Sequence, residues 1–168
     1  MWTEEAIRNL VNTIYSKGQL LSKATSGDFH VSDALIEEVK AYGSEGILQL
    51  IESAGEGLQG ISIEGNSVKF TGFPETDDPL KAKAFAMLEG AITKTCQTSK
   101  ILARKKDTDN EKFVFRVWLL RLGLGGPEYK EERKMLYANL PGHVAFRTEK
   151  DKENWYARRK EKKNHVAL

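Results

Sequence analysis

The segment Phe113–Leu124 constrains the fold of this chain more than any other, because only two arginines and a glycine interrupt its run of apolar residues. At 100° per residue, two sets of apolar side chains fall on opposite sides of a helix: Phe113, Val117, Leu120 and Leu124 on one, and Phe115, Trp118, Leu119 and Leu122 on the other. A helix with two apolar sides is normally packed between other elements. The sequence therefore predicts a buried central helix over 109–123, with Arg116 and Arg121 in the gaps between its apolar sides.

Helical spacing of apolar residues predicts further helices along the chain. They are expected over 3–24, from Ser32 to Gly43, in a short stretch that stops near Gly55, from Leu80 toward Arg104, over 127–139 and from near Thr148. Residues 61–63 and 68–70 alternate apolar with polar side chains across the turn-forming residues 64–67, which predicts a β-hairpin. The expected fold is mainly α with one small β-hairpin (α+β), with about six helices around the central helix 109–123.

Charge divides the sequence into two unequal halves. Residues 1–84 hold 7 Lys and Arg against 13 Asp and Glu, a net charge of −6, whereas residues 85–168 hold 19 against 11, a net charge of +8. We expect a single domain, 1–168, comprising acidic helices plus the hairpin (1–73), a basic helical core (79–147) and a peripheral basic C-terminal helix (148–168). Two interpretations stay open: the basic half binds an anion such as nucleic acid, or the halves neutralise each other in the fold.

Cysteine content and the distribution of apolar residues bear on the cellular setting. A single cysteine, Cys96, excludes an intramolecular disulfide and fits a reducing compartment. The N-terminus has no signal-peptide pattern, and no run of 18 apolar residues occurs, so no membrane-spanning segment is expected. We therefore expect a cytoplasmic protein.

Motifs for cofactor or metal chemistry are weak. Residues 55–60 match the G-x-G-x-x-G string of dinucleotide sites, but here a helix precedes and a strand follows, the reverse of what that site requires. Residues 123–126 are rich in glycine but lack the Lys-Ser/Thr of a phosphate-binding loop. The histidines, His30, His143 and His165, follow no metal-ligand spacing. The expectation is no cofactor and no metal.

Catalytic chemistry also lacks a local motif. A nucleophilic pair of Cys96 and His143 is an alternative, since such partners meet in space and not in sequence. A cysteine in the middle of a helix is more often a small buried hydrophobe. Among the many carboxylates, Glu131 and Glu132 are expected on a solvated helix face, which disfavours a general acid and base there. We predict that the protein is not an enzyme.

Two basic clusters are the strongest functional signal. Lys and Arg neutralise phosphates, and aromatic side chains among them stack on bases in proteins that bind single strands. The residues predicted to bind nucleic acid or a nucleoprotein are Lys100, Arg104, Lys105, Lys106, Arg147, Trp155, Tyr156, Arg158, Arg159, Lys162 and Lys163. Four acidic residues within 149–161 dilute the second cluster, so a solubilising terminal helix anchored by Trp155 is the alternative.

Residues 109–123 and 127–139 also permit a helix-turn-helix, because a short glycine-containing turn joins them. A DNA-binding regulator is therefore a further hypothesis. The start of the second helix, residues 128–134, is acidic, whereas recognition helices usually present Arg, Asn or Gln there. This composition weighs against the hypothesis.

Seven segments carry a resemblance that spans nearly the whole chain and is most specific over 110–147: Ile7–Asn12, Leu20–Ala24, Asn110–Phe113, Arg116–Gly123, Glu128–Lys130, Arg133–Lys134 and Asn139–Arg147. On these segments the chain resembles a protein family from phages and mobile elements of gut Firmicutes, whose members often carry the label "virulence-related protein". The family has no catalytic motif to carry over, so the resemblance assigns no site residues.

The resemblance implies a prophage-borne protein in the cytoplasm of a bacterial host cell. Small phage proteins without catalytic residues often act as transcription regulators or as inhibitors of host defence, including anti-CRISPR proteins that bind Cas9 with its guide RNA. We therefore expect a phage-encoded, non-enzymatic protein that binds a host nucleoprotein or nucleic acid, most concretely an anti-CRISPR protein inhibiting Cas9. A helix-turn-helix-like DNA-binding regulator of a prophage is the alternative.

Overall fold

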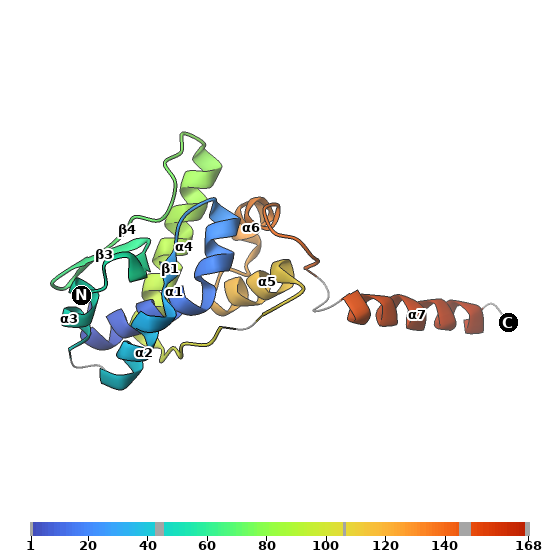
Figure 1. Ribbon diagram of the computed structural model, residues 1–168. Coiled ribbons are helices and arrows are strands. Elements are labelled where there is room, and N and C mark those ends of the chain that lie inside the picture. Colours follow the sequence, from blue (N-terminus) through green and yellow to red (C-terminus); the bar gives the residue numbers. More distant parts are fainter. Residues whose placement is uncertain (1, 43–45, 106, 145–148, 167–168) are drawn as a thin grey trace.

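The computed structural model describes residues 2–42, 46–105, 107–144 and 149–166, which form a mainly helical protein (Figure 1). Its described residues contain seven α-helices: α1 (Glu4–Thr25), α2 (Asp33–Tyr42), α3 (Ile47–Glu52), α4 (Pro79–Thr98), α5 (Glu111–Arg121), α6 (Lys130–Tyr137) and α7 (Glu149–Val166). Short strands and 3-10 turns complete the fold: β1 (His30–Val31), β2 (Leu58–Gln59), β3 (Ile61–Glu64), β4 (Ser67–Phe70), η1 (Gly55–Gly57) and η2 (Pro127–Tyr129). The predicted α+β class is confirmed, and a second two-stranded sheet is added to the hairpin.

Capping residues set both ends of α1. Thr3 Oγ1 accepts a hydrogen bond from the backbone N–H of Ala6 at 3.1 Å, and two glutamates occupy the first turn, where the helix dipole favours negative charge. Ser26 ends the helix in the left-handed region, at φ 58°. The helix predicted over 3–24 is confirmed.

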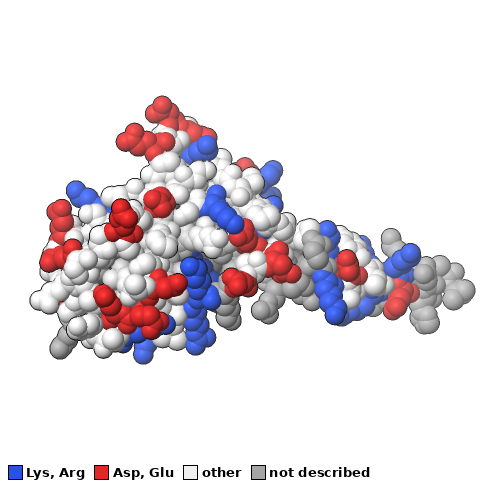
Figure 2. Space-filling view, viewed as in Figure 1, with Lys and Arg blue, Asp and Glu red and all other residues white. Residues whose placement is uncertain are grey.

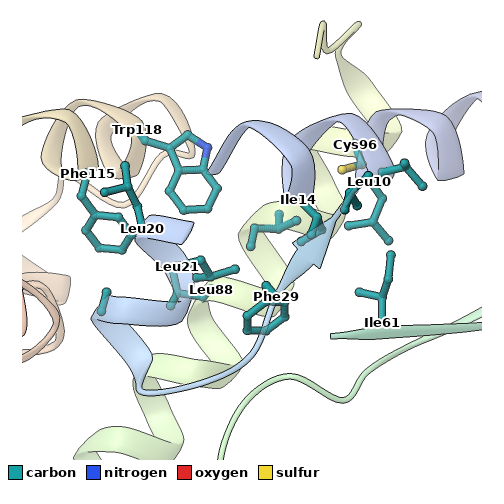
Figure 3. Close-up of a cluster of buried hydrophobic side chains, with 14 of the residues drawn as sticks. Leu10, Ile14, Leu20, Leu21, Phe29, Ile61, Leu88, Cys96, Phe115 and Trp118 are labelled. Carbon is teal, nitrogen blue, oxygen red and sulfur yellow. The ribbon is translucent and has the colours of Figure 1, made fainter. Parts of the chain in front are cut away.

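α1 is the central helix of the fold, and the prediction that helix 109–123 is central is wrong. α1 buries 13 of its 22 residues and packs against α2, α3, α4, α6 and β1. The helix in the predicted central position, α5, buries Phe115, Trp118 and Leu119 within its bounds. In Figure 3, Phe115 and Trp118 lie beside Leu20 of α1, in the same cluster as Leu88 of α4. One apolar side of α5 therefore joins the core. On the other side, Phe113, Val117 and Leu120 stay outside it, whereas Leu124, which follows the helix, is buried in the core.

The physical reason is that α1 buries polar residues as well as apolar ones. Asn9, Asn12 and Thr13 are at most 6% exposed, and polar side chains tolerate burial when they are hydrogen-bonded. Thr13 donates its hydroxyl hydrogen to the backbone oxygen of Asn9 at 2.8 Å. At Gly18, an added Cβ would lie only 2.7 Å from the backbone oxygen of Phe29, so the glycine permits this close approach. Apolar periodicity alone underestimates the burial of α1.

The hairpin predicted around residues 64–67 is confirmed as β3 and β4. The strands pair antiparallel, from Ile61 opposite Phe70 to Glu64 opposite Ser67, which leaves a two-residue loop. Gly65 opens this loop at φ 60°, a conformation that favours glycine. Ile61 is buried in the helical core, and this contact stabilises a hairpin that would be marginal alone.

The second sheet pairs β1 with β2, with Val31 opposite Leu58. Strands of two residues are too short to show alternation, so the sequence did not predict them. Beside this sheet, the ring of Phe73 lies 4.9 Å from that of Phe29 and 5.1 Å from that of Phe85, between ring centroids. These contacts join the loop before α4 to the body.

α7 projects away from the remaining elements, as Figure 1 shows at the C-terminal end of the chain. Its side chains alternate charge with little apolar content, and all those described are exposed except that of Lys152, which is half-buried. We call the described residues up to 144 the body, to distinguish them from α7. Among the described helices of both parts, none combines the length and the apolar content needed to cross a membrane.

Candidate nucleic-acid interface

The first predicted basic cluster lies on an extended segment and not at the end of a helix. α4 ends at Thr98, so the helix predicted to run toward Arg104 stops short of it. Residues 99–105, which we call the strap, run beside α1 instead. Lys100, Leu102 and Arg104 of the strap are exposed, and the residues between them are half-buried against the core.

Three polar side chains of α1 hold the strap in place. Asn9 accepts at Oδ1 from the N–H of Ile101 at 3.0 Å, and its Nδ2 donates to two further backbone oxygens at 2.8 Å. Asn12 Nδ2 donates to the backbone oxygen of Ile101 at 2.9 Å, and Ser16 Oγ accepts from the N–H of Arg104 at 2.9 Å. These bonds replace the ones that a longer α4 would make, which explains why the helix does not continue.

The end of the strap borders a groove of about 1220 Å³ between α1, residues 28–31 and residues 107–121. Lys105 Nζ lies 5.4 Å from the centre of the Tyr15 ring, within cation–π range. The charged residues that line the groove have both signs: Lys17, Lys23, Arg104, Lys105 and Arg121, with Asp28, Asp107, Asp109 and Glu111. Such mixed charge suits a phosphate backbone poorly. Lys106, also predicted to bind, lies outside the described residues.

The second predicted cluster lies on α7, where one side of the helix is free of acidic residues. At 100° per residue, this side collects seven positions: Lys152, Trp155, Tyr156, Arg159, Lys162, Lys163 and Val166. We call it the basic face of α7. Asp151 and Glu149 lie just beyond its two edges, and the side chains of residues 162–166 lie outside the described part of the structure. The four acidic residues of the helix fall elsewhere around the axis, and so do Lys150, Arg158 and Lys160. The acidic residues that dilute this cluster in the sequence therefore lie outside one side of α7.

The aromatic residues of the basic face are presented to solvent together with a cation. Trp155 is 43% exposed and Tyr156 is 53% exposed, and neither ring is part of the hydrophobic core described above. The guanidinium of Arg159 lies 5.1 Å from the centre of the Trp155 ring, and the two rings are 5.0 Å apart and nearly perpendicular. Rings and guanidinium groups in such an arrangement are the kind on which bases stack.

The structure does not bring the two basic clusters together. In Figure 1 the strap follows α4 in the body, whereas α7 lies beyond α5 at the other end of the molecule. Of the remaining predicted residues, Arg158 lies off the basic face and Arg147 lies outside the described residues. Sequence reasoning left Lys152 out of the binding set. A helical projection of residues 149–166 would have included it.

The segment that contains α7 carries only part of the positive charge of the second half, since residues 85–148 still have a net charge of +5 against −6 in residues 1–84. Residues 149–168 hold 7 basic and 4 acidic residues, a net charge of +3, so residues 1–148 have a net charge of −1. Figure 2 shows both signs interspersed over the body, with acidic side chains at the tip formed by the loop before α4. Exposed Glu75, Asp77 and Asp78 belong to that loop. The two halves of the sequence largely balance within the body, and the excess positive charge lies on the projecting helix.

Cys96 lies in the core between α4 and α1, 1% exposed, with its Sγ 3.9 Å from the hydroxyl of Thr13 (Figure 3). Burial raises the pKa of the Cys96 thiol to about 12, with a small opposing contribution from the Thr13 hydrogen bond. Reactive cysteines have lowered pKa values, because the thiolate is the nucleophile. His143, the suggested partner, donates its backbone N–H to Asn110 Oδ1 at 2.9 Å. The surroundings of the thiol are those of a packing residue.

Glu131 and Glu132 were both predicted on a solvated helix face. The prediction is confirmed for Glu131 and is wrong for Glu132. Glu132 is 2% exposed, and its Oε1 lies 3.1 Å from the Nζ of Lys83 on α4. Hydrogen bonds from its own backbone N–H and from Lys83 lower the pKa of Glu132. The buried carboxylate thus stays ionised and joins α6 to α4, a contact between helices that sequence spacing does not reveal.

The glycine-rich segments have structural roles. Residues 55–60 form η1 and β2 after α3, an order opposite to that of a dinucleotide site. In the turn after α5, Arg133 Nη1 donates to the backbone oxygens of Leu124 at 2.8 Å and Gly126 at 2.6 Å. This arginine, the only one within α6, is therefore occupied by hydrogen bonds to the turn before the helix. The side chains that α6 exposes include Lys130, Glu131 and Lys134, of mixed charge.

Within the part of the chain that the structure describes, no group of three or more His, Cys, Asp and Glu side chains is placed to hold a metal ion. Comparisons with family models, with curated proteins and with solved structures found no match for this chain.

Proposed function

We propose that this chain is a phage-encoded, non-enzymatic binding protein that acts in the host cytoplasm on a nucleoprotein, most concretely an anti-CRISPR protein that inhibits guide-loaded Cas9. The observation that carries the proposal is the basic face of α7. This face carries no acidic residue, its residues Trp155, Tyr156 and Arg159 are exposed, and α7 projects from a body that is close to neutral.

The composition of α7 supports a role in binding. A helix that is polar all round gains little from packing, and propensity alone rarely maintains an isolated helix in water. Contact with phosphates neutralises the cations on one side and releases counterions, which is favourable at moderate ionic strength. Trp155 and Tyr156, which lie among the cations, add stacking on unpaired bases. A nucleoprotein with accessible guide RNA offers both kinds of contact.

The resemblance to phage proteins supports the host setting of the proposal. The buried, protonated Cys96 and the ionised Glu132 within its structural ion pair support a binding role over catalysis. The occupied Arg133 and the mixed charge of α6 make a helix-turn-helix regulator the weaker candidate.

The decisive experiment is cleavage of target DNA by guide-loaded Cas9 with the purified protein titrated in. We expect dose-dependent loss of cleavage. The basic-face variant Arg159→Glu, Lys162→Glu, Lys163→Glu should require roughly tenfold more protein or greater for the same inhibition, because three cations no longer neutralise phosphates. The matched control reverses three cations elsewhere on the same helix, Lys150, Arg158 and Lys160, and changes the net charge equally.

The outcomes separate the alternatives. Equal loss of inhibition in both variants would mean that net charge matters and the face does not. Absence of inhibition at large excess would remove Cas9 from the proposal. Selective binding of one DNA duplex over others would then favour the prophage regulator. Against a short single-stranded RNA, the basic-face variant should flatten the salt dependence of log Kd by about 0.7 for each phosphate that it no longer neutralises.

A further inference from the structure

A second surface, on the side of α5 that faces away from the core, is built for a different kind of partner. Phe113, Val117 and Leu120 recur at positions i, i+4 and i+7 of α5 and form what we call the outer stripe. Leu120 is 44% exposed, the other two are half-buried, and none of the three belongs to the hydrophobic core. The opposite side of the same helix supplies Phe115, Trp118 and Leu119 to that core.

Cations border the outer stripe on both sides. At 100° per residue, Lys112 and Arg116 lie along one edge of the stripe, and Arg121 lies along the other. Within the described residues, no carboxylate forms an ion pair with any of these three cations. The acidic residue of α5, Glu111, is turned away to Lys23 on α1, with Oε1 and Nζ 2.7 Å apart. Apolar side chains between cations that form no ion pair within the described residues therefore mark this face, although Arg121 also lines the groove of mixed charge.

The turn after α5 leaves the C-terminal end of the outer stripe accessible. The backbone of Gly125 passes close to the side chain of Leu120, which would have to shift if residue 125 carried a Cβ. Leu120 remains exposed beside a backbone that carries no side chain at that point. The stripe is thus open at its C-terminal end.

We propose that the outer stripe docks an acidic amphipathic helix of a partner protein. Three residues spanning seven positions cover roughly 10 Å, about two helical turns, which matches the anchor spacing of a helix laid along a groove or ridge. Carboxylates beside the anchors of such a helix would meet Lys112, Arg116 and Arg121. The chain's own α7 does not fit this description, because its aromatic residues Trp155 and Tyr156 lie on its basic face and docking them here would bring like charges together.

The occupant is a segment with apolar anchors and carboxylates. Its docking site on α5 is separate from the basic face of α7. The inference therefore does not depend on the proposed function. A stripe of three side chains is smaller than a standard stable interface, so the isolated segment should bind weakly. Its contribution would be specificity for a particular protein partner.

The test uses the full chain, titrated with a synthetic amphipathic helix that carries leucines on one side and glutamates elsewhere. Backbone amide chemical shifts should change on α5 and near Gly125, and the peptide should bind at least roughly tenfold more tightly than its lysine counterpart. Leu120→Asp should weaken binding at least roughly tenfold by removing the most exposed anchor. Arg121→Glu should weaken peptide binding roughly threefold or more, because it replaces an exposed ion pair with a repulsion between like charges.

Two controls keep the result specific. Leu102→Asp removes a comparably exposed leucine from the strap, and the basic-face variant of α7 removes cations from the other surface; neither should change peptide affinity. The inference would be overturned by equal binding of the lysine peptide, by shifts confined to other elements, or by unchanged affinity in Leu120→Asp. Sedimentation of the chain alone as a dimer that Leu120→Asp dissociates would also overturn it, since a second copy would then be the occupant.

Discussion

α1 and α7 are long helices of one chain with opposite relations to their surroundings. α1 buries 13 of its 22 residues and packs against four of the other six described helices and against β1, whereas every described side chain of α7 is exposed except for half-buried Lys152. Both contain many polar residues. In α1, Asn9, Asn12 and Ser16 are hydrogen-bonded to the strap, and in α7 the polar residues meet solvent.

The difference shows that polarity alone does not decide which helix is central. A buried polar side chain costs little when its hydrogen bonds are satisfied, and the resulting network specifies one partner segment. An exposed polar helix has no such network, and its stability depends on propensity or on binding. α1 is thus stabilised by the fold, whereas α7 is available to a partner.

Matched proline substitutions should show the largest difference in stability between α1 and α7. Gln19→Pro changes an exposed position within α1, and Ala157→Pro changes an exposed position within α7. The first should destabilise the protein by ~3 kcal/mol or more, because it removes a hydrogen bond and distorts the central helix. The second should unwind α7 but alter the stability of the body by less than ~0.5 kcal/mol. Urea unfolding followed by tryptophan fluorescence and far-UV circular dichroism measures both; similar losses would contradict the contrast.

Removal of buried side chains should give the next largest effect. Leu10 on α1 is 0% exposed, so Leu10→Ala should cost about 2–5 kcal/mol through reduced transfer energy and a cavity. Leu120→Ala, at 44% exposure on α5, should cost less than ~1 kcal/mol. Chemical denaturation of the two variants tests the assignment of α1, and not α5, as the central helix. A larger loss at Leu120 would favour α5 as the central helix.

The hydrogen bonds to the strap should contribute a smaller amount. Asn9→Ala removes three bonds and leaves backbone groups of the strap without partners, so a loss of about 1–3 kcal/mol is expected. Amide hydrogen exchange at Ile101 should accelerate at the same time, because its N–H donates to Asn9. The control is Asn154→Ala on α7, an exposed site that should be neutral. Unchanged exchange in Asn9→Ala would show that the strap is held by other interactions.

The burial of Cys96 beside α1 should appear as a pH dependence. Its folded-state pKa of about 12 lies above the reference value of 9.0, so the folded protein keeps the proton where the unfolded chain releases it. The contribution to stability is complete below pH 9 and is lost as the pH rises toward 12. From pH 8 to 10, the wild type should lose about 1.4 kcal/mol more than Cys96→Ala does. Parallel pH profiles of unfolding for the two proteins would contradict the burial of the thiol.

Local signals in the sequence predicted much of the fold. Thr3, Asp78 and Asn110 cap α1, α4 and α5 by accepting backbone hydrogen bonds, and such residues are recognisable before an apolar run. Alternation identified β3 and β4 for the same local reason. The end of α4 was missed because it depends on Asn9 and Asn12, some ninety positions away, which no window around the strap contains.

For the candidate site too, local features could be predicted from the sequence, whereas the arrangement of distant segments could not. The composition of residues 149–166 pointed to Trp155, Tyr156 and Arg159, and helical geometry then separated a basic face from the acidic residues. The distance between the strap and α7 was not predictable, because it depends on how the whole body folds. The outer stripe of α5 was visible as an apolar pattern, but sequence periodicity gave no means to tell which of the two sides of the helix joins the core.

Asn110 sets the reach of the C-terminal helix. Its Oδ1 accepts the N–H of Phe113 at 3.2 Å and that of His143 at 2.9 Å, so the start of α5 and the point where the chain departs toward α7 share one atom. From His143 to Glu149 the chain extends roughly 20 Å at most, and α7 adds about 27 Å of helix. Any surface that the tip of α7 touches must therefore lie within roughly 50 Å of Asn110. For a partner already held by the body, α7 can therefore act only within that volume, and its local concentration is set by its covalent connection to the body and not by the concentration of protein in solution.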